Sequence, residues 1–178
     1  MSAVCWLSAP GSRGAYVLRI AIDRAVRLPV GRFRGGAPLD FSAGVWLYVG
    51  SARGPDGLAR RLLRHAIRRQ GAPHTVLPAL VEAFDRMPPV EKRLHWHVDY
   101  LLECPQADLE AVYLLAEPDA PLESALVRRL AALPEVSAPF RGLGAGDDPG
   151  GTHLLMVDAP PVWWSGFPVY LRGWRQNP

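Results

Sequence analysis

Residues 45–70 read VWLYVGSARGPDGLARRLLRHAIRRQ, and this stretch decides which fold the sequence predicts. Its first five residues, Val45–Val49, are dense in β-branched and aromatic side chains, which is typical of a short buried strand. Gly50 and Gly54-Pro55 are expected to end the strand. Asp56 is expected to cap a following helix by accepting backbone N–H bonds. A strand, a turn and a helix are therefore predicted in succession.

The helix is predicted to begin at Leu58 and to stop before Gly71-Ala72-Pro73. Residues four apart share a helix face, and an apolar stripe results from Leu58, Leu62, Ala66, Ala59, Leu63 and Ile67. The remaining two rows are basic: Arg60, Arg64 and Arg68 in one, Arg61, His65 and Arg69 in the other. Arginines often cover an exposed helix face without any partner. Like charges four residues apart nevertheless repel, so this face favours an anion such as phosphate, which guanidinium binds with two N–H groups.

Composition indicates a single globular domain. The chain has 178 residues, of which 49% are hydrophobic and 21% charged, and a length of this order is enough to bury a core. The net charge is only +3, and Lys92 is the one lysine among 20 cationic Lys and Arg residues. Cys5 and Cys104 are too few for a disulfide framework. With no long apolar run and no secretory h-region, the sequence predicts a cytoplasmic protein that does not bind membranes.

Further elements follow from periodicity on both sides of the opening stretch. Strands are predicted at Gly14–Ile22 and 109–116, and an edge strand at Val26–Phe33 is expected to pair antiparallel with Val45–Val49. A short packing helix is predicted at 78–86, and another helix is expected to start at 119–121. Residues 134–151 are rich in Gly and Pro and are expected to form a loop before a strand at 152–157. The predicted fold class is α/β, with a small, mainly antiparallel central sheet flanked by helices.

A pair of short motifs resembles the GIY-YIG nuclease superfamily: Gly14-Ala15-Tyr16 and Tyr48-Val49-Gly50, followed by Arg61 and His65. A longer stretch resembles a short prokaryotic branch of it, called domain of unknown function 123. The motifs of that branch stand here as Tyr48–Ala52, Gly57-Leu58 through Arg64-His65, Trp96–Leu101, Glu123-Ser124 and Thr152-His153-Leu154. The branch usually has cysteines where this chain has Ser124 and Asp148, so no cysteine-based feature is expected there.

The resemblance implies a domain organisation and an activity. It covers residues 14 to 157 and implies a GIY-YIG-like domain at 14–158, with a loosely held lead-in at 1–13 and an aromatic and basic extension at 159–178. The implied activity is metal-dependent hydrolysis of nucleic-acid phosphodiesters, an endonuclease reaction with DNA as the favoured substrate.

The same resemblance implies roles for individual residues. The catalytic set is Tyr16, Tyr48, Arg61 and His65. Glu123 would hold a single divalent ion, Mg²⁺ or Mn²⁺. The residues expected to contact the nucleic-acid backbone are Arg60, Arg64 and Arg68. No role is assigned to Asp147, Asp148 or His153.

Two other functions stay open at this point. One is a noncatalytic nucleic-acid-binding module on the same scaffold. The other is a metal-binding protein that uses His95, His97 and Asp99, which would share one face if this segment were a strand. Leu94, Val98, Leu101 and Leu102 have helical spacing, which favours a helix and separates the three ligand candidates.

The extension 159–178 alternates aromatic residues with arginines: Trp163, Trp164, Phe167, Tyr170, Arg172, Trp174 and Arg175. Such a pattern can clamp single-stranded nucleic acid by stacking. Packing on the domain's own surface, a homodimer contact or a contact with another protein is the more common use, and is expected here.

Overall fold

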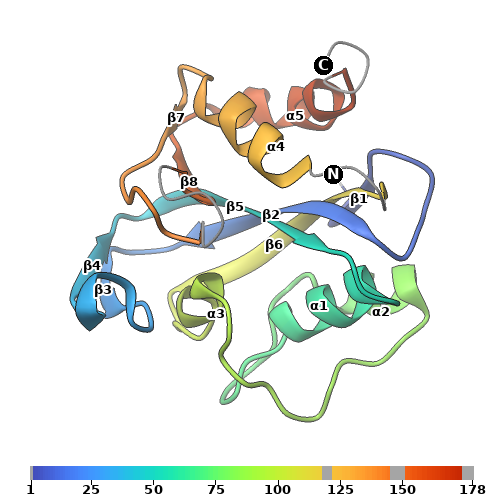
Figure 1. The fold of residues 1–178 in the computed structure, drawn as a ribbon, viewed down its shortest axis with the longest axis horizontal. Helices are drawn as coiled ribbons and strands as arrows, with labels where there is room; N and C mark the ends of the chain where they lie inside the picture. The colour runs from blue at the N-terminus through green and yellow to red at the C-terminus, as the bar shows by residue number, and fades with distance from the viewer. Residues whose placement is uncertain (1, 118–121, 145–150, 174–178) are drawn as a thin grey trace.

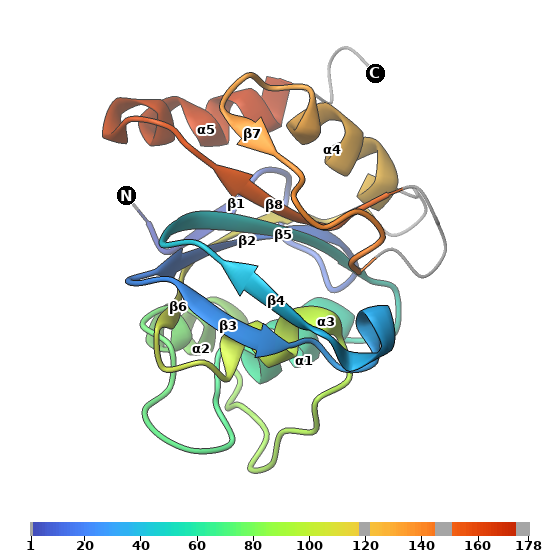
Figure 2. The ribbon, with the colours of Figure 1, turned by 90° about the vertical axis from the view of Figure 1, so that its left-hand side faces the viewer.

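The computed structural model describes residues 2–117, 122–144 and 151–173. A six-stranded sheet in the order β1-β6-β2-β5-β8-β7 forms its centre. The helices α1, α2 and α3 cover one face of this sheet, and α4 and α5 cover the other (Figures 1 and 2). The fold is therefore α/β with a mainly antiparallel central sheet between helices, which confirms the predicted fold class.

The middle of the sheet is the antiparallel pair β2 (Gly14–Ile22) and β5 (Gly44–Ala52), in a register that pairs Gly14 with Ala52 and Ile22 with Gly44. β6 (Ala107–Leu115) pairs antiparallel with the other edge of β2. The predicted break at Gly50 is wrong. β5 continues to Ala52 because β2 offers paired residues as far as Gly14.

The outer strands come from both ends of the chain. β1 (Val4–Trp6) pairs parallel with β6, so part of the lead-in that was expected to be loose forms a sheet edge. On the other side, β8 (Leu154–Val157) pairs antiparallel with β5, and the short β7 (Val136–Ser137) pairs with β8. The predicted strand at 152–157 is thus confirmed in its second part.

The segment after β2 forms a separate ribbon instead of an edge strand beside β5. β3 (Val26–Pro29) pairs antiparallel with β4 (Pro38–Phe41), and the 3-10 turn η1 (Phe33–Gly36) lies between them. The predicted partner was wrong for two reasons. β8 already occupies the free edge of β5. Gly31, Gly35 and Gly36 also adopt positive φ, which turns the chain back on itself.

The first helical layer consists of α1 (Gly57–His65), α2 (Leu77–Phe84) and α3 (His97–Leu102). Its apolar side chains join Leu18, Ile20 and Trp46 of the sheet in one core cluster. Helices were predicted in all three places. α1 ends earlier than predicted, because Ala66 is its C-cap and the carbonyl of Ala66 accepts the N–H of His74 from the returning chain.

The predicted cap of α1 is also wrong. Asp56 has a left-handed backbone (φ 50°), and its side chain makes no capping hydrogen bond. Its carboxylate instead lies 3.2 Å from the guanidinium of Arg86, at the far end of α2. The side chain therefore contributes to the α1–α2 surface, and the first N–H groups of the helix donate instead to the backbone carbonyls of Gly54 and Ser12.

The second helical layer consists of α4 (Leu122–Ala131) and α5 (Pro161–Gly173), which pack on the other face of the sheet. Trp164, Phe167 and Leu171 of α5 are buried there. Most of the C-terminal extension thus covers the domain's own sheet, as expected of its more common use. Trp174 and Arg175 lie outside the described residues.

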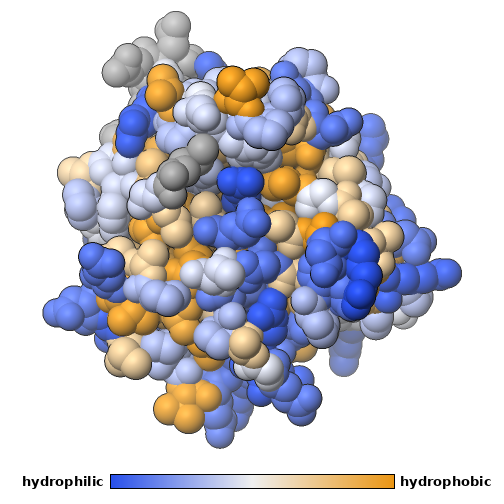
Figure 3. Space-filling view, turned by 180° about the vertical axis from the view of Figure 1, so that it is seen from behind, coloured by the Kyte–Doolittle hydropathy of each residue, from blue (hydrophilic) through white to orange (hydrophobic). Residues whose placement is uncertain are grey.

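The surface is mixed in character. In Figure 3 a band of hydrophilic residues runs down the middle of one face, with smaller hydrophobic groups beside it. Large hydrophobic side chains that are strongly exposed are scattered in the sequence: Met87, Val90, Val162 and Val169. None of the helices in the described ranges combines the length and the apolar character that crossing a bilayer requires.

Candidate active site

Two tyrosines from the central strand pair face α1. Tyr16 of β2 lies opposite Gly50 of β5, and Tyr48 lies two residues earlier on β5. A Cβ atom on Gly50 would lie 2.5 Å from both Cζ and the hydroxyl of Tyr16, so the Tyr16 ring fits only because residue 50 has no side chain. The two tyrosine ring centroids are 6.4 Å apart, and both side chains are buried.

α1 contributes His65, which is fully buried instead of belonging to an exposed basic face. Its Nε2 lies 3.1 Å from the hydroxyl of Tyr16, and its Nδ1 lies 2.9 Å from Oδ1 of Asp99. Burial lowers the pKa of His65 to about 4, against the opposing effect of Asp99, so the imidazole is neutral at pH 7. With an ionised Asp99 at Nδ1, that nitrogen carries the proton, and the Tyr16 hydroxyl donates to Nε2.

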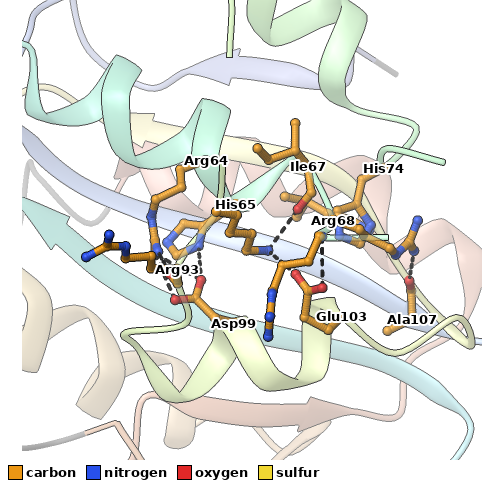
Figure 4. A network of polar contacts seen from close by, with 12 residues as sticks. Arg64, His65, Ile67, Arg68, His74, Arg93, Asp99, Glu103 and Ala107 are labelled. Atoms are coloured by element: carbon orange, nitrogen blue, oxygen red, sulfur yellow. Dashed lines mark hydrogen bonds and ion pairs between the residues drawn. The ribbon is translucent and has the colours of Figure 1, made fainter. Parts of the chain in front are cut away.

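Asp99 is the centre of this polar network (Figure 4). Arg64 donates to both of its oxygens at 3.0 and 2.8 Å, and the backbone N–H groups of His95 and Trp96 donate to Oδ2 at 2.9 Å each. Burial alone would raise the pKa of Asp99, but the contacts with His65, His95 and Arg64 hold it well below its usual range. Asp99 is therefore an anion that fixes His65, Arg64 and the start of α3 together.

The segment around Asp99 does not form the metal site that was considered for it. His97 begins α3, as the helical spacing predicted, and its Nδ1 accepts a hydrogen bond from the N–H of Gly144 at 3.1 Å. Asp99 faces α1 instead. Within residues 2–117, 122–144 and 151–173, no three His, Cys, Asp or Glu side chains are arranged to hold a metal ion.

Glu123 reaches the same region from the first turn of α4. The Ser51 hydroxyl donates to its Oε2, and Nδ1 of His153 lies 2.7 Å from its Oε1. Arg61 donates to the carbonyl of Ser51, which places its guanidinium beside this carboxylate. Burial alone would raise the pKa of Glu123, but His153, Ser51 and Arg61 together lower it. Glu123 is consequently a half-buried anion.

These groups share one site although they come from both faces of the sheet. β8 pairs with β5 only as far as Tyr48, so residues 50–52 of β5 form an edge that both faces can reach. Burial raises the pKa values of Tyr16 and Tyr48, and both hydroxyls lie close enough to Arg61 and Glu123 to feel their charges. The structure thus brings together Tyr16, Tyr48, Arg61, His65 and Glu123, which the resemblance had selected.

The donor set around Glu123 fits a divalent ion of the kind implied. Mg²⁺ keeps several water ligands and uses one or two carboxylates together with substrate phosphate oxygens. Glu123 offers one partly exposed carboxylate, which is the ligand type in that pattern, and its two oxygens here contact Ser51 and His153. The fit involves Glu123 alone among the carboxylates described here.

The arginines expected to contact a backbone differ in their surroundings. Arg60 is exposed. Arg64 is held by Asp99, and its Nη1 donates to the carbonyl of Arg93 at 2.6 Å. Arg68 lies beyond the end of α1 and donates to the carbonyls of Ala72 and Ala107. Two of the three guanidinium groups are thus engaged within the fold.

Sequence reasoning missed several members of the site. Asp99 was considered only as a metal ligand, and Ser51 and His153 had no assigned role, although both lie within motifs of the resemblance. The backbone of Gly144 also belongs here, because a Cβ at that position would lie 3.1 Å from Cβ of His153 and 3.5 Å from Tyr48. Asp147 and Asp148 lie outside the described residues.

Comparison with known families gives a match over most of the chain. The family described as "Domain of unknown function DUF123" matches residues 15–163. No curated protein and no solved structure matches the chain.

Proposed function

The chain belongs to the DUF123 family, and from this premise and the site geometry we propose that it is a metal-dependent endonuclease of the GIY-YIG type that hydrolyses nucleic-acid phosphodiesters. The observation that carries the proposal is the position of Glu123. Its carboxylate lies beside Arg61 and close to Tyr16 and Tyr48, although it comes from a different helix on the opposite face of the sheet. A scaffold used only for binding has no need of an anion at its phosphate site, since the anion repels the ligand.

In the proposed reaction Arg61 binds the scissile phosphate. Its positive charge stabilises the negative charge that develops on the phosphoryl oxygens in the transition state, and this lowers the activation barrier. Phosphate binding replaces the hydrogen bond from Arg61 to the Ser51 carbonyl.

Proton transfer follows the chain Tyr16–His65–Asp99. The raised pKa of Tyr16 keeps its hydroxyl protonated at neutral pH, so it acts as a relay and not as a phenolate base. The attacking water gives a proton to Tyr16 while Tyr16 gives its own proton to Nε2 of His65. Asp99 stabilises the imidazolium that forms, as the carboxylate does in a Ser-His-Asp triad.

Glu123 would hold the divalent ion, with Ser51 and His153 fixing the carboxylate. A bound Mg²⁺ or Mn²⁺ supplies charge neutralisation at the leaving oxygen. DNA is the favoured substrate. A cytoplasmic setting agrees with Cys5 and Cys104, which are both free thiols.

The test separates catalysis from binding. Wild type and Glu123→Gln are incubated with DNA and RNA substrates in Mg²⁺ or Mn²⁺, and binding is measured without metal. We expect Glu123→Gln to lose cleavage by at least about 100-fold, because the amide cannot hold the ion, while binding is kept or tightened. Equal cleavage by both proteins would show that Glu123 is not the metal ligand. A wild type that binds but cleaves none of the substrates would favour the noncatalytic module.

A further inference from the structure

A groove of about 850 Å³ lies between α1 and the segment 86–96. Five arginines line it: Arg60, Arg61 and Arg64 from α1, and Arg86 and Arg93 from the facing segment. Among the described residues that line it, Glu91 is the only acidic one. The side of α1 that carries the arginines therefore faces a second, partly basic wall that the helical pattern alone did not indicate.

The charges in the groove are only partly balanced. Arg64 is paired with Asp99, and Arg86 with Asp56. Arg60 and Arg93 are exposed, and their guanidinium groups have no hydrogen bond or ion pair with any other residue in the described part of the chain. They leave two positive charges against Glu91, while Arg61 lies beside the carboxylate of Glu123. A groove with this excess attracts an anion.

The groove meets the candidate active site at Arg61. This residue lines the groove and also donates to Ser51, the residue that holds Glu123. A ligand lying along the groove therefore has one end at the proposed scissile phosphate, and the groove is a route to the site instead of a separate pocket.

The groove also has an aromatic wall. The indole of Trp96 lies 4.1 Å from the guanidinium carbons of both Arg61 and Arg64, and the ring of His95 lies 4.5 Å from that of Trp96. Basic side chains that follow the backbone, combined with aromatic rings that contact bases, are the common design of single-strand binding grooves.

The size of the groove selects one strand. Ligand sites of roughly 300–1,000 Å³ enclose small molecules, so about 850 Å³ holds a few nucleotides. A duplex, whose two backbones are separated by a major groove about 12 Å wide, would need more room than a single strand to lie in it.

We propose that this groove binds a single-stranded segment of DNA or RNA next to the scissile phosphate, with Arg60 and Arg93 on its phosphates and a base against Trp96. That the strand is cut at the adjoining site rests on the proposed nuclease function. Binding of the strand in the groove does not depend on it. The substrate is accordingly a nucleic acid with an unpaired segment beside the cut, and the walls read its backbone without selecting a sequence.

The test is fluorescence anisotropy in EDTA with labelled oligonucleotides of roughly six nucleotides, within the usual site size. The probes are oligo-dT, oligo-U and a blunt duplex long enough to stay paired. The variants are Arg60→Ala/Arg93→Ala and the control Arg24→Ala, an exposed arginine beyond the far end of β2. All three side chains are exposed, so the variants are expected to fold, and thermal unfolding checks this.

We expect either single strand to bind at least about 10-fold more tightly than the duplex, and the double variant to lose about 10-fold, with Arg24→Ala within about 2-fold of wild type. Tighter binding of oligo-dT than of oligo-U identifies DNA as the ligand, and the reverse identifies RNA. Either result supports the proposal. Duplex binding as tight as single-strand binding, or a folded double variant with unchanged affinity, would overturn it. If single strands bind through the groove but are never cut in Mg²⁺ or Mn²⁺, the nuclease function fails and the groove stands.

Discussion

The hydroxyl of Tyr16 lies 3.1 Å from Nε2 of His65, and both side chains are fully buried. The hydrogen bond joins a strand in the middle of the sheet to the helix that covers it. It holds the two residues in one protonation pattern, because a neutral imidazole with its proton on Nδ1 can only accept at Nε2. The predictions below depend on this pair and on its neighbours.

The free energy of unfolding should fall as the pH is lowered from about 6.5 toward 4, because of the buried histidines. Burial lowers the pKa values of His65 and His74 to about 4, from about 6.5 in the unfolded chain, and lowers that of His97 in the same direction. The unfolded state therefore binds more protons between pH 6.5 and 4, so this stability is complete above pH 6.5 and is lost as pH falls toward 4.

Urea unfolding at pH 7, 6 and 5 measures this effect, with an expected loss on the order of 2–4 kcal/mol in total over the range. Asp99, whose pKa is lowered, loses its contribution only below about pH 4, which keeps the two effects apart. His95→Gln serves as the control, because this side chain is exposed. An unfolding free energy that stays constant from pH 7 to pH 5 would contradict the buried neutral state of His65 and His74.

Gly50→Ala should displace the ring of Tyr16. The new methyl group would lie 2.5 Å from its hydroxyl, and overpacking of this kind costs about 1–3 kcal/mol. We expect this loss in urea unfolding, together with a loss of cleavage. Gly54→Ala is the matched control, since a Cβ there meets nothing within 4 Å, and it should change stability by less than about 0.5 kcal/mol. Equal effects of the two substitutions would mean that the Tyr16 ring does not need the space at residue 50.

Asp99→Asn should reduce cleavage more than binding. The amide no longer stabilises an imidazolium at His65 and leaves Arg64 without its anion, and breaking a buried charge pair costs about 3–5 kcal/mol. Activity is therefore measured per folded molecule, at a temperature where the variant is folded. Asp108→Asn is the comparison: Asp108 lies outside the site, accepts hydrogen bonds from Thr75, and has its Oδ1 3.2 Å from Nδ1 of His74.

For Asp108→Asn we expect reduced stability and unchanged cleavage per folded molecule. Asp99→Asn should also shift the pH dependence of cleavage, which a purely structural residue would not do. Identical pH profiles and rates for Asp99→Asn and wild type would remove Asp99 and His65 from the proposed proton relay.

The affinity for single strands should fall as the salt concentration rises, with a slope set by the number of arginines that contact phosphates. With Arg60, Arg61 and Arg93 as the phosphate contacts, the slope of log K against log salt should be about −2. Arg93→Ala should make the slope shallower by about 0.7. Arg68→Ala should leave it unchanged and lower stability instead, since that guanidinium is hydrogen-bonded to the carbonyls of Ala72 and Ala107. An affinity that is flat between low and physiological salt would exclude phosphate recognition.

The local patterns of the sequence sufficed for the α/β class, the central strands, the helix carrying Arg61 and His65, and the place of Glu123 in the first turn of a helix. Strand alternation and helical spacing act over a few residues, so they can be read from adjacent positions. They also favoured a helix for the segment with His97 and Asp99, and α3 confirms it.

The tertiary structure alone decided which polar groups meet. Asp99 and His65 are 34 residues apart, and Ser51 and Glu123 are 72 apart, so no local period relates them. The helical pattern marked His65, Arg64 and Arg68 as part of one basic face that favours an anion. The acids and carbonyls of distant segments instead bury or bind all three. Which cations stay free for a ligand depends on where distant anions and carbonyls pack, because a charge removed from water must be paired.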